Sequence, residues 1–332
     1  MALKGKSVLI TGGTGSFGQT AARYLLQQDL CEKVIIFSRD EWKQWEMRRA
    51  DPLFDHPKIR YFIGDVRDRK RLHLAFQDVD IVIHAAALKQ VTAAEYNPTE
   101  FIQTNILGAM NVIENAMACG VKKVIALSTD KSVNPINLYG ATKLCSDKLF
   151  IASNSYVGSR GFPLFSVVRY GNVLGSRGSL IPRWKELVDH GATKLPITDP
   201  QMSRFWISLN ESVTFVLKSL EMMRGREIFV PKIPSIRIVD LAKAFAPQLA
   251  HDIVGIREGE KMHELLISAD EAHYTLDCGN YYIVSPPVHK TTFADRIEKL
   301  QAGRRVPPDF TYRSDTNPLW LDVEGAKKLL RQ

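Results

Sequence analysis

The stretch that decides the fold is residues 7–18, Ser-Val-Leu-Ile-Thr-Gly-Gly-Thr-Gly-Ser-Phe-Gly, with a helical pattern following over residues 18–28. The apolar run predicts a buried strand, and the glycines at positions 12, 15 and 18 permit a tight turn and a close backbone approach to a ligand. The helix that follows offers unpaired N–H groups to an anion. We therefore expect this turn to hold the pyrophosphate of a dinucleotide. The alternative, a glycine-rich turn without a ligand, is disfavoured because the motif opens the chain's first strand–helix unit.

Short β-branched runs alternate with longer helical patterns through the first half of the chain. Strands are predicted at 33–38, 60–64, 80–85, 123–128 and 165–169, and helices at 97–119 and at about 139–153. Such continuous apolar strands are typical of a parallel sheet that is covered on both faces. The predicted fold class is α/β, with a doubly wound, mostly parallel Rossmann sheet and a smaller C-terminal substrate-binding lobe.

The character of the sequence changes at Gly171, after which Gly- and Pro-containing irregular segments predominate. We expect residues 1–170 to form a dinucleotide-binding Rossmann domain and residues 171–332 to form mainly the substrate lobe. A helix at 211–223 and a strand at 227–231 suggest that about 207–231 returns to the Rossmann domain.

Composition excludes several classes of protein. The 332 residues are 45% hydrophobic and 24% charged, as in an ordinary globular chain. The net charge of +8 fits a small anionic ligand as well as nucleic acid, but the basic residues are scattered among acids, without a basic arm, and we expect no nucleic-acid partner. No apolar run is long enough to span a membrane, and the N-terminus has no signal-peptide pattern, so a cytoplasmic location without membrane contact is expected. Four scattered cysteines and eight histidines lack metal-ligand spacing, so no metal is expected.

The residues at the end of the second predicted strand indicate whether the cofactor is NAD or NADP. An acidic residue there would bind the adenosine 2′-hydroxyl, but the sequence has Ser38, followed by Arg39 and Lys43, which suit a 2′-phosphate. We therefore expect NADP. Two alternatives remain: Asp40 or Glu41 could face the ribose instead, or Arg39 and Lys43 could be solvated and contact no ligand. The expected cofactor residues from these strand ends are Gly12, Thr14, Gly15, Ser16, Phe17, Gly18, Ser38, Arg39, Lys43, Asp65, Val66, Ala85 and Ala86.

A tyrosine and a lysine follow the fifth predicted strand at helical spacing. Tyr139 and Lys143 are four residues apart and share one face of a helix. A nearby ammonium lowers the pKa of a phenol, which lets tyrosine take a hydroxyl proton while a hydride leaves for a nicotinamide. Both residues are expected to contact the cofactor as well. A chance pair on an exposed helix is disfavoured, because the strand-end Thr129 lies just upstream.

These motifs and the chain length resemble the extended short-chain dehydrogenase/reductase family of nucleotide-sugar enzymes. Within it, Asp130-Lys131 between Thr129 and Tyr139 is similar to the inverting UDP-N-acetylglucosamine 4,6-dehydratases that start pseudaminic acid synthesis for flagellin glycosylation. Hexose-type dehydratases carry Asp-Glu at this place. The resemblance extends to residues 169–179 and 257–264, which in such enzymes help to hold the UDP-sugar.

The resemblance implies an NADP-dependent dehydration of UDP-N-acetylglucosamine with inversion at C5, giving UDP-2-acetamido-2,6-dideoxy-β-L-arabino-hex-4-ulose. Tyr139, aided by Lys143, would deprotonate the C4 hydroxyl. Lys131 would take the C5 proton, which needs a lowered pKa, and Asp130 would protonate the leaving C6 oxygen, which needs a raised one. Thr129 completes the expected catalytic set, which is Lys131, Asp130, Tyr139, Lys143 and Thr129.

The resemblance also implies the partners. The substrate contacts would be Lys89, Thr129, Asn172, Val173, Ser179, Thr198, Arg257 and Glu260. Lys89 would reach the cofactor or the sugar, with an exposed loop lysine as the alternative. A homo-oligomer larger than a dimer, such as a hexamer, is expected.

Two other functions stay open. A UDP-hexose 4-epimerase would share the Tyr139–Lys143 pair but would not need Asp130 and Lys131. A redox-sensing regulator would bind NADP without catalysis, although an intact Tyr139–Lys143 pair argues against it.

Overall fold

The structure is a computed structural model that describes residues 3–285 and 303–331. Its centre is a ten-stranded sheet in the order β16-β14-β15-β10-β6-β5-β4-β1-β2-β3. From β3 to β10 all neighbours are parallel, and β15, β14 and β16 extend the sheet by antiparallel pairing. The strands are β1 (Ser7–Thr11), β2 (Lys33–Ser38), β3 (Ile59–Ile63), β4 (Ile81–His84), β5 (Lys123–Thr129), β6 (Leu164–Tyr170), β10 (Ile228–Pro231), β14 (Thr275–Asp277), β15 (Tyr281–Val284) and β16 (Arg304–Arg305).

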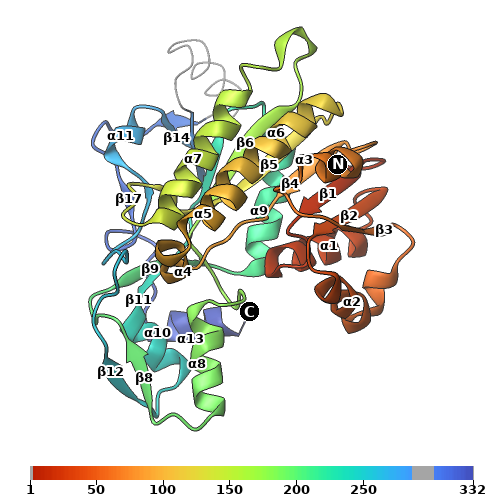
Figure 1. The fold of residues 1–332 in the computed structure, drawn as a ribbon. Helices are drawn as coiled ribbons and strands as arrows, with labels where there is room; N and C mark the ends of the chain where they lie inside the picture. Colours follow the sequence, from red (N-terminus) through yellow and green to blue (C-terminus); the bar gives the residue numbers. More distant parts are fainter. Residues whose placement is uncertain (1–2, 286–302, 332) are drawn as a thin grey trace.

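Helices cover both faces of this sheet (Figure 1). They are α1 (Ser16–Gln27), α2 (Glu41–Ala50), α3 (Arg69–Ala75), α4 (Val91–Tyr96), α5 (Pro98–Phe101), α6 (Gly108–Ala118), α7 (Leu138–Ser153) and α9 (Leu209–Met222). α1 contacts α9, while α6 lies between α3 and α7. Residues of β1 and β4 such as Leu9, Ile10 and Val82 are fully buried, as expected for strands enclosed by two helical layers. The predicted doubly wound α/β fold is confirmed.

The helix predicted over 97–119 is interrupted. α5 passes into a π-helical segment, Ile102–Leu107, before α6 begins at Gly108. Asn105 lies in the π-helical segment and bonds Leu88 with both ends of its amide: Nδ2 donates to the carbonyl oxygen at 2.9 Å and Oδ1 accepts from the backbone N–H at 2.9 Å. The wider π-helical turn therefore occurs where the Asn105 side chain binds the backbone of the loop after β4.

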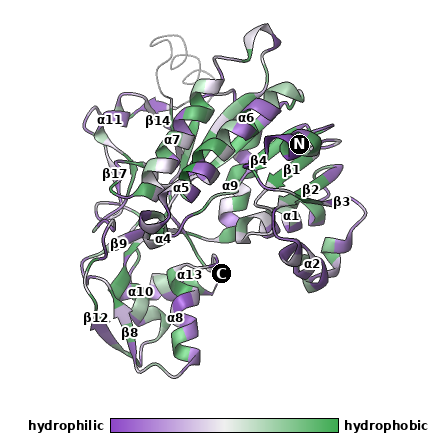
Figure 2. Ribbon diagram, in the orientation of Figure 1, coloured by the Kyte–Doolittle hydropathy of each residue, from purple (hydrophilic) through white to green (hydrophobic). Residues whose placement is uncertain are grey.

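A smaller lobe follows β6 and has its own core. Three small sheets form it: β7 (Asn172–Val173) with β9 (Ser203–Ile207) and β11 (Ser235–Arg237), β8 (Lys194–Ile197) with β12 (Ala250–Ile253), and β13 (Leu265–Ile267) with β17 (Tyr312–Arg313). Its helices are α8 (Leu180–Asp189), α10 (Ile238–Phe245) and α13 (Val323–Leu330), while α11 (Ala269–Ala272) lies beside β14 at the edge of the main sheet (Figure 1). Trp184 and Trp206 are fully buried at its centre. Figure 2 shows the central strands green and much of the outer surface of α2 and α8 purple.

Residues beyond Gly171 contribute to both parts of the molecule. β10 lies in the main sheet, as do β14, β15 and β16, three strands that the sequence did not predict. Residues 286–302 and 332 of the expected C-terminal lobe lie outside the described residues. Within the described ranges, no helix combines the length and apolar character required to cross a bilayer.

Candidate active site

A cavity of about 620 Å³ runs along the carboxyl ends of the parallel strands, where the smaller lobe faces the sheet. Ligand cavities in proteins usually measure about 300–1,000 Å³. In doubly wound sheets ligands bind at this edge, where the strand order reverses on either side of β1. Both parts of the molecule border the cavity, so a ligand bound in it can contact the main sheet and the smaller lobe together.

The glycine motif forms one end of the cavity. Gly12 has a φ of +67°, and a Cβ on it would lie 2.9 Å from the backbone of Ala86. A Cβ on Gly18 would lie 2.5 Å from the backbone of Gly13, so α1 can pack closely against the turn only because this residue is glycine. Thr14, Gly15, Ser16, Phe17 and Gly18 all border the cavity at the N-terminus of α1. These residues fit a dinucleotide pyrophosphate, which would accept hydrogen bonds from the free N–H groups.

The ends of β2 and β3 border the same cavity. Ser38, Arg39, Lys43, Asp65 and Val66 are all in its wall. Lys43 Nζ pairs with Asp40 at 2.7 Å, and Arg39 lies 3.8 Å from Asp65. Both cations are about half exposed, so they can turn toward an incoming phosphate.

A buried threonine–histidine pair supports the Ala85–Ala86 segment of the cavity wall. The Thr11 hydroxyl bonds Nδ1 of His84 over 2.8 Å and accepts the N–H of Ala86 at 3.3 Å. Burial lowers the pKa of His84 to about 3, with the Lys143 charge adding to the effect, so the ring is neutral. Ala85 and Ala86, both in the cavity wall, are thereby fixed next to Gly12.

The predicted tyrosine–lysine pair lies in the first turns of α7. Asn137 caps this helix by accepting the N–H of Gly140 at 2.7 Å. Tyr139 and Lys143 are buried, and both border the cavity. Burial raises the pKa of Tyr139 to about 12, although the Lys131 charge and a Thr129 hydrogen bond oppose the rise. The prediction of a lowered Tyr139 pKa is therefore wrong for this structure, because burial outweighs the charge of Lys131.

A buried carboxylate continues the same helix face. Asp147, four residues after Lys143, accepts hydrogen bonds from Ser128 Oγ at 2.7 Å and Ser132 Oγ at 3.0 Å. Burial lowers the pKa of Lys143, and the charge of Asp147 opposes that shift. Sequence reasoning missed Asp147, although its spacing of four from Lys143 was a signal.

The turn after β5 places Asp130 and Lys131 side by side. Thr129 Oγ1 donates to Asp130 Oδ1 at 2.9 Å, and Lys131 Nζ donates to the same oxygen at 3.0 Å. Asp130 is fully buried behind the cavity wall, whereas Thr129 and Lys131 border the cavity. Burial raises the pKa of Asp130, as predicted.

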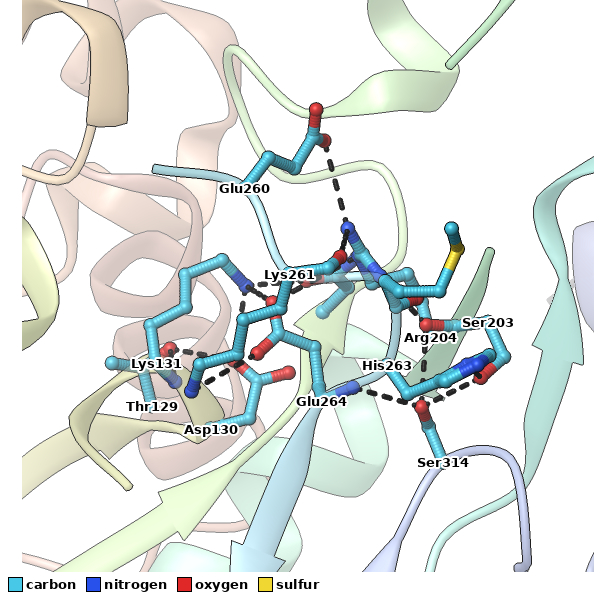
Figure 3. A network of polar contacts seen from close by, with 12 residues as sticks. Thr129, Asp130, Lys131, Ser203, Arg204, Glu260, Lys261, His263, Glu264 and Ser314 are labelled. Atoms are coloured by element: carbon cyan, nitrogen blue, oxygen red, sulfur yellow. Dashed lines mark hydrogen bonds and ion pairs between the residues drawn. The ribbon is translucent and has the colours of Figure 1, made fainter. Parts of the chain in front are cut away.

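The predicted lowering of the Lys131 pKa is wrong. Burial alone would lower it, but the carboxylates of Asp130 and Glu264 outweigh that effect and raise the pKa of Lys131. Glu264 comes from the smaller lobe, and its Oε1 lies 3.2 Å from Lys131 Nζ (Figure 3). Arg204, also from that lobe and also missed by sequence reasoning, borders the cavity beside it.

Most residues predicted to hold the substrate border the cavity. They are Lys89, Thr129, Asn172, Val173, Ser179, Arg257 and Glu260. Lys89 Nζ donates to Ser176 Oγ at 3.4 Å, and burial lowers its pKa. Thr198 is different: it is buried just after β8 and does not border the cavity, so the structure does not bring it to the site. In the described part of the chain, no cluster of His, Cys, Asp and Glu could hold a metal ion.

The sequence matches, over residues 8–286, the family described as "Polysaccharide biosynthesis protein". The chain belongs to this family. It is similar to a protein of Campylobacter jejuni named "UDP-N-acetylglucosamine 4,6-dehydratase (inverting)", with 56% identity over 331 residues, 98% of this chain and 97% of the relative. It is also similar to a "UDP-glucose 4-epimerase" of Rickettsia felis, with 44% identity over 332 residues, 98% of this chain and 95% of the relative.

Among solved structures, Pen from Bacillus thuringiensis superimposes with a TM-score of 0.88 at 34% identity, covering 100% of this chain and 98% of that one. Membership of the polysaccharide biosynthesis family and these relatives confirm the resemblance that the glycine motif and the Tyr139–Lys143 pair indicated.

Proposed function

We propose that this protein removes water from UDP-N-acetylglucosamine across C5 and C6, using NADP, with inversion at C5. The observation that carries the proposal is that Tyr139, Lys143 and Lys131 border one cavity, with Asp130 buried directly behind Lys131. Tyr139 and Lys143 suit a transient oxidation at C4, and Lys131 with Asp130 suits an elimination. The Campylobacter relative, whose name states this reaction, supports the proposal.

The proposed reaction has three steps. Tyr139 takes the proton of the C4 hydroxyl as a hydride leaves C4, and the resulting ketone acidifies C5–H. Lys131 then removes the C5 proton, and the C6 oxygen leaves as water with a proton from Asp130. Finally C6 receives a hydride and C5 regains a proton on the opposite face. The nicotinamide, when bound, supplies the hydride acceptor for C4 and the hydride donor for C6, so the net change is the loss of one water.

The elimination needs an unprotonated Lys131 and a protonated Asp130. Their nitrogen and oxygen lie 3.0 Å apart, so a single proton moving from Lys131 to Asp130 produces both states together. The burial that raises the pKa of Asp130 favours this transfer. Thr129 contacts both Asp130 and the cavity, and connects the buried acid with the substrate space.

Several finer assignments belong to the same proposal. Arg39 and Lys43 beside Ser38 support NADP over NAD, because cations suit a 2′-phosphate. Arg257 and Glu260 in the wall, with Asn172 and Lys89, support UDP-sugar binding. The resemblance supports a cytoplasmic homo-oligomer larger than a dimer and a product that enters pseudaminic acid synthesis.

The second candidate is a UDP-hexose 4-epimerase, which the Rickettsia relative's name favours. Proton NMR of the protein incubated with UDP-N-acetylglucosamine separates the possibilities. A new C6 methyl signal is expected for the dehydratase. A C4-epimerised sugar would establish the epimerase instead, and an unchanged sugar would favour a regulator that only binds the nucleotide.

A further inference from the structure

The ammonium of Lys131 has three partners, two hydrogen-bond acceptors and the carboxylate of an ion pair. Asp130 Oδ1 lies at 3.0 Å, Glu264 Oε1 at 3.2 Å and Asn172 Oδ1 at 3.3 Å. These partners come from the turn after β5, from the residue before β13, and from β7. The nitrogen is therefore fixed in position as a charged group, and Glu264 is the ion-pair partner that the smaller lobe contributes (Figure 3).

The backbone of Glu264 is anchored on both sides by Ser314. Its backbone N–H donates to Ser314 Oγ at 3.0 Å, and its carbonyl accepts the N–H of Ser314 at 2.9 Å. The side chain is 2% exposed, with Lys261 Nζ 3.8 Å and Arg204 Nε 3.9 Å from its oxygens. A buried carboxylate is costly unless cations surround it, and this one has three. Of these three cations, Lys131 lies closest to it, at 3.2 Å.

The segment that carries Glu264 is attached to the turn that carries Lys131. Lys261 Nζ donates to the carbonyl of Val133 at 2.6 Å, and Asn137 Nδ2 donates to the carbonyl of Gly259 at 2.7 Å. Arg204 also binds this segment, because its guanidinium donates to the carbonyl of Lys261 at 2.8 Å. The position of Glu264 relative to Lys131 is thus set by several bonds at once.

We propose that Glu264 is a positioning residue for the elimination, which holds Lys131 Nζ at the cavity wall and retains the proton that Lys131 shares with Asp130. This inference rests on the proposed dehydratase function. Glu264 acts through Lys131, so its loss affects the elimination and not the C4 oxidation, which uses Tyr139 and Lys143.

The pH dependence of the elimination follows from the charges around Lys131. The active state of the Asp130–Lys131 pair has one proton, and the reaction fails at alkaline pH when that proton is lost. Without the negative charge of Glu264, the positive charge of Arg204 would destabilise the Lys131 ammonium. The proton shared by Lys131 and Asp130 would then be lost at a lower pH. The titratable and charged groups facing Lys131 are Asp130, Glu264, Tyr139, Arg204, Lys261 and Lys89.

The test compares Glu264→Gln, which removes the charge at nearly constant size, with Glu264→Asp, which keeps the charge on a shorter arm. Single turnovers with UDP-N-acetylglucosamine are followed from about pH 7 to about pH 11.5, a range that extends above the ordinary lysine pKa of about 10.4, because the pKa of Lys131 is raised. NADPH formation reports the oxidation, and the 6-deoxy-4-keto sugar reports the elimination.

In Glu264→Gln we expect the alkaline fall of the elimination to move to lower pH by about one unit or more. We also expect the maximum elimination rate of both variants to drop about tenfold or more, as for loss of an orienting neighbour. In Glu264→Asp the alkaline fall should stay where the wild type has it. NADPH formation should change little in either variant. Glu227→Gln is the control, because Glu227 is also a buried glutamate but does not border the cavity.

Two results would overturn the inference. One is a Glu264→Gln enzyme with the wild-type rate and pH profile. The other is a loss of elimination in both variants that parallels a fall in melting temperature without moving the alkaline limb, which would mean a purely structural role.

A separate measurement distinguishes failure of this inference from failure of the proposed function. If the wild type makes no 6-deoxy sugar, the function is wrong, and NMR of protein labelled at the lysine ε-carbons still tests whether Glu264 retains the proton. The Lys131 signal, assigned by its absence in Lys131→Met, should titrate at lower pH in Glu264→Gln than in wild type. An unmoved titration would overturn the inference.

Discussion

Gly140, directly after Tyr139, sets the distance between α7 and the turn that carries Lys131. A Cβ at this position would lie 2.2 Å from the carbonyl oxygen of Lys131 and 3.0 Å from Cβ of Pro135. Carbon atoms are essentially never found within 3.0 Å of such a neighbour, so Gly140→Ala requires a displacement of at least 3.0 − 2.2 = 0.8 Å. The atom in the way is backbone, and it cannot turn aside as a side chain would.

The displacement would separate Tyr139, the proposed acceptor of the C4 hydroxyl proton, from Lys131, the proposed base of the elimination. Misplacing a catalytic group by about 1 Å costs on the order of 100-fold in rate. Overpacking costs about 1–3 kcal/mol, and alanine recovers at most about 1 kcal/mol in a helix. We therefore expect Gly140→Ala to lose about 100-fold in product formation while losing only about 1–2 kcal/mol of stability.

The assay is formation of the 6-deoxy-4-keto sugar, with thermal unfolding measured on the same preparation. Gly325→Ala in α13 is the matched control, because its Cβ would meet only side-chain atoms of Leu321 and Asp322. A Gly140→Ala protein with wild-type turnover and melting temperature would refute the reasoning, since the close contact would then impose nothing on the site.

Three further predictions follow from the site. Lys131→Ala should still form NADPH on addition of UDP-N-acetylglucosamine but lose about 100-fold or more in 6-deoxy sugar; equal loss of both signals would contradict its role as base. Arg39→Ala should weaken NADP binding about tenfold or more and leave NAD binding unchanged; recovery of NAD alone from the denatured wild type would contradict the cofactor proposal. His84, with its pKa lowered from 6.5 to about 3 by burial, binds fewer protons folded than unfolded, so stability is complete above pH 6.5 and falls below it. Two pH units of this fall amount to about 2–3 kcal/mol, which denaturant unfolding at two pH values should show in wild type and not in His84→Gln.

The sequence predicted the Rossmann part because its signals are local. The residues from Ser7 to Gly18 carry the strand, the turn and the helix start within one motif, and the buried strands are continuous apolar runs. Where a side chain from elsewhere determines the backbone, the prediction was less accurate. The π-helical segment at Ile102–Leu107 goes with the bonds from Asn105 to Leu88, which helical periodicity does not reveal. The added strands β14, β15 and β16 are two to four residues long, too short to show a period.

The candidate site shows the same division. Residues from contiguous motifs, such as Gly12, Tyr139 and Lys143, were identified as site residues and border the cavity. Arg204 was missed, because it reaches the site from a separate lobe. The error on the Lys131 pKa has the same origin, since considering Asp130-Lys131 alone leaves out the carboxylate of Glu264.

The burial of Asp130 can be understood from the charge balance of the site. In the proposed reaction, an anionic UDP-sugar in the cavity would make any loss of positive charge from the wall more costly, so Lys131 would not easily release its proton to solvent. Transfer to Asp130 leaves the total charge unchanged, and in a dry site it costs much less than separating charge. Full burial of Asp130 raises its pKa and stabilises the neutral acid that this transfer creates. In the proposed mechanism the proton taken from Lys131 would then be the one that the C6 oxygen receives, so preparing the base would also prepare the acid.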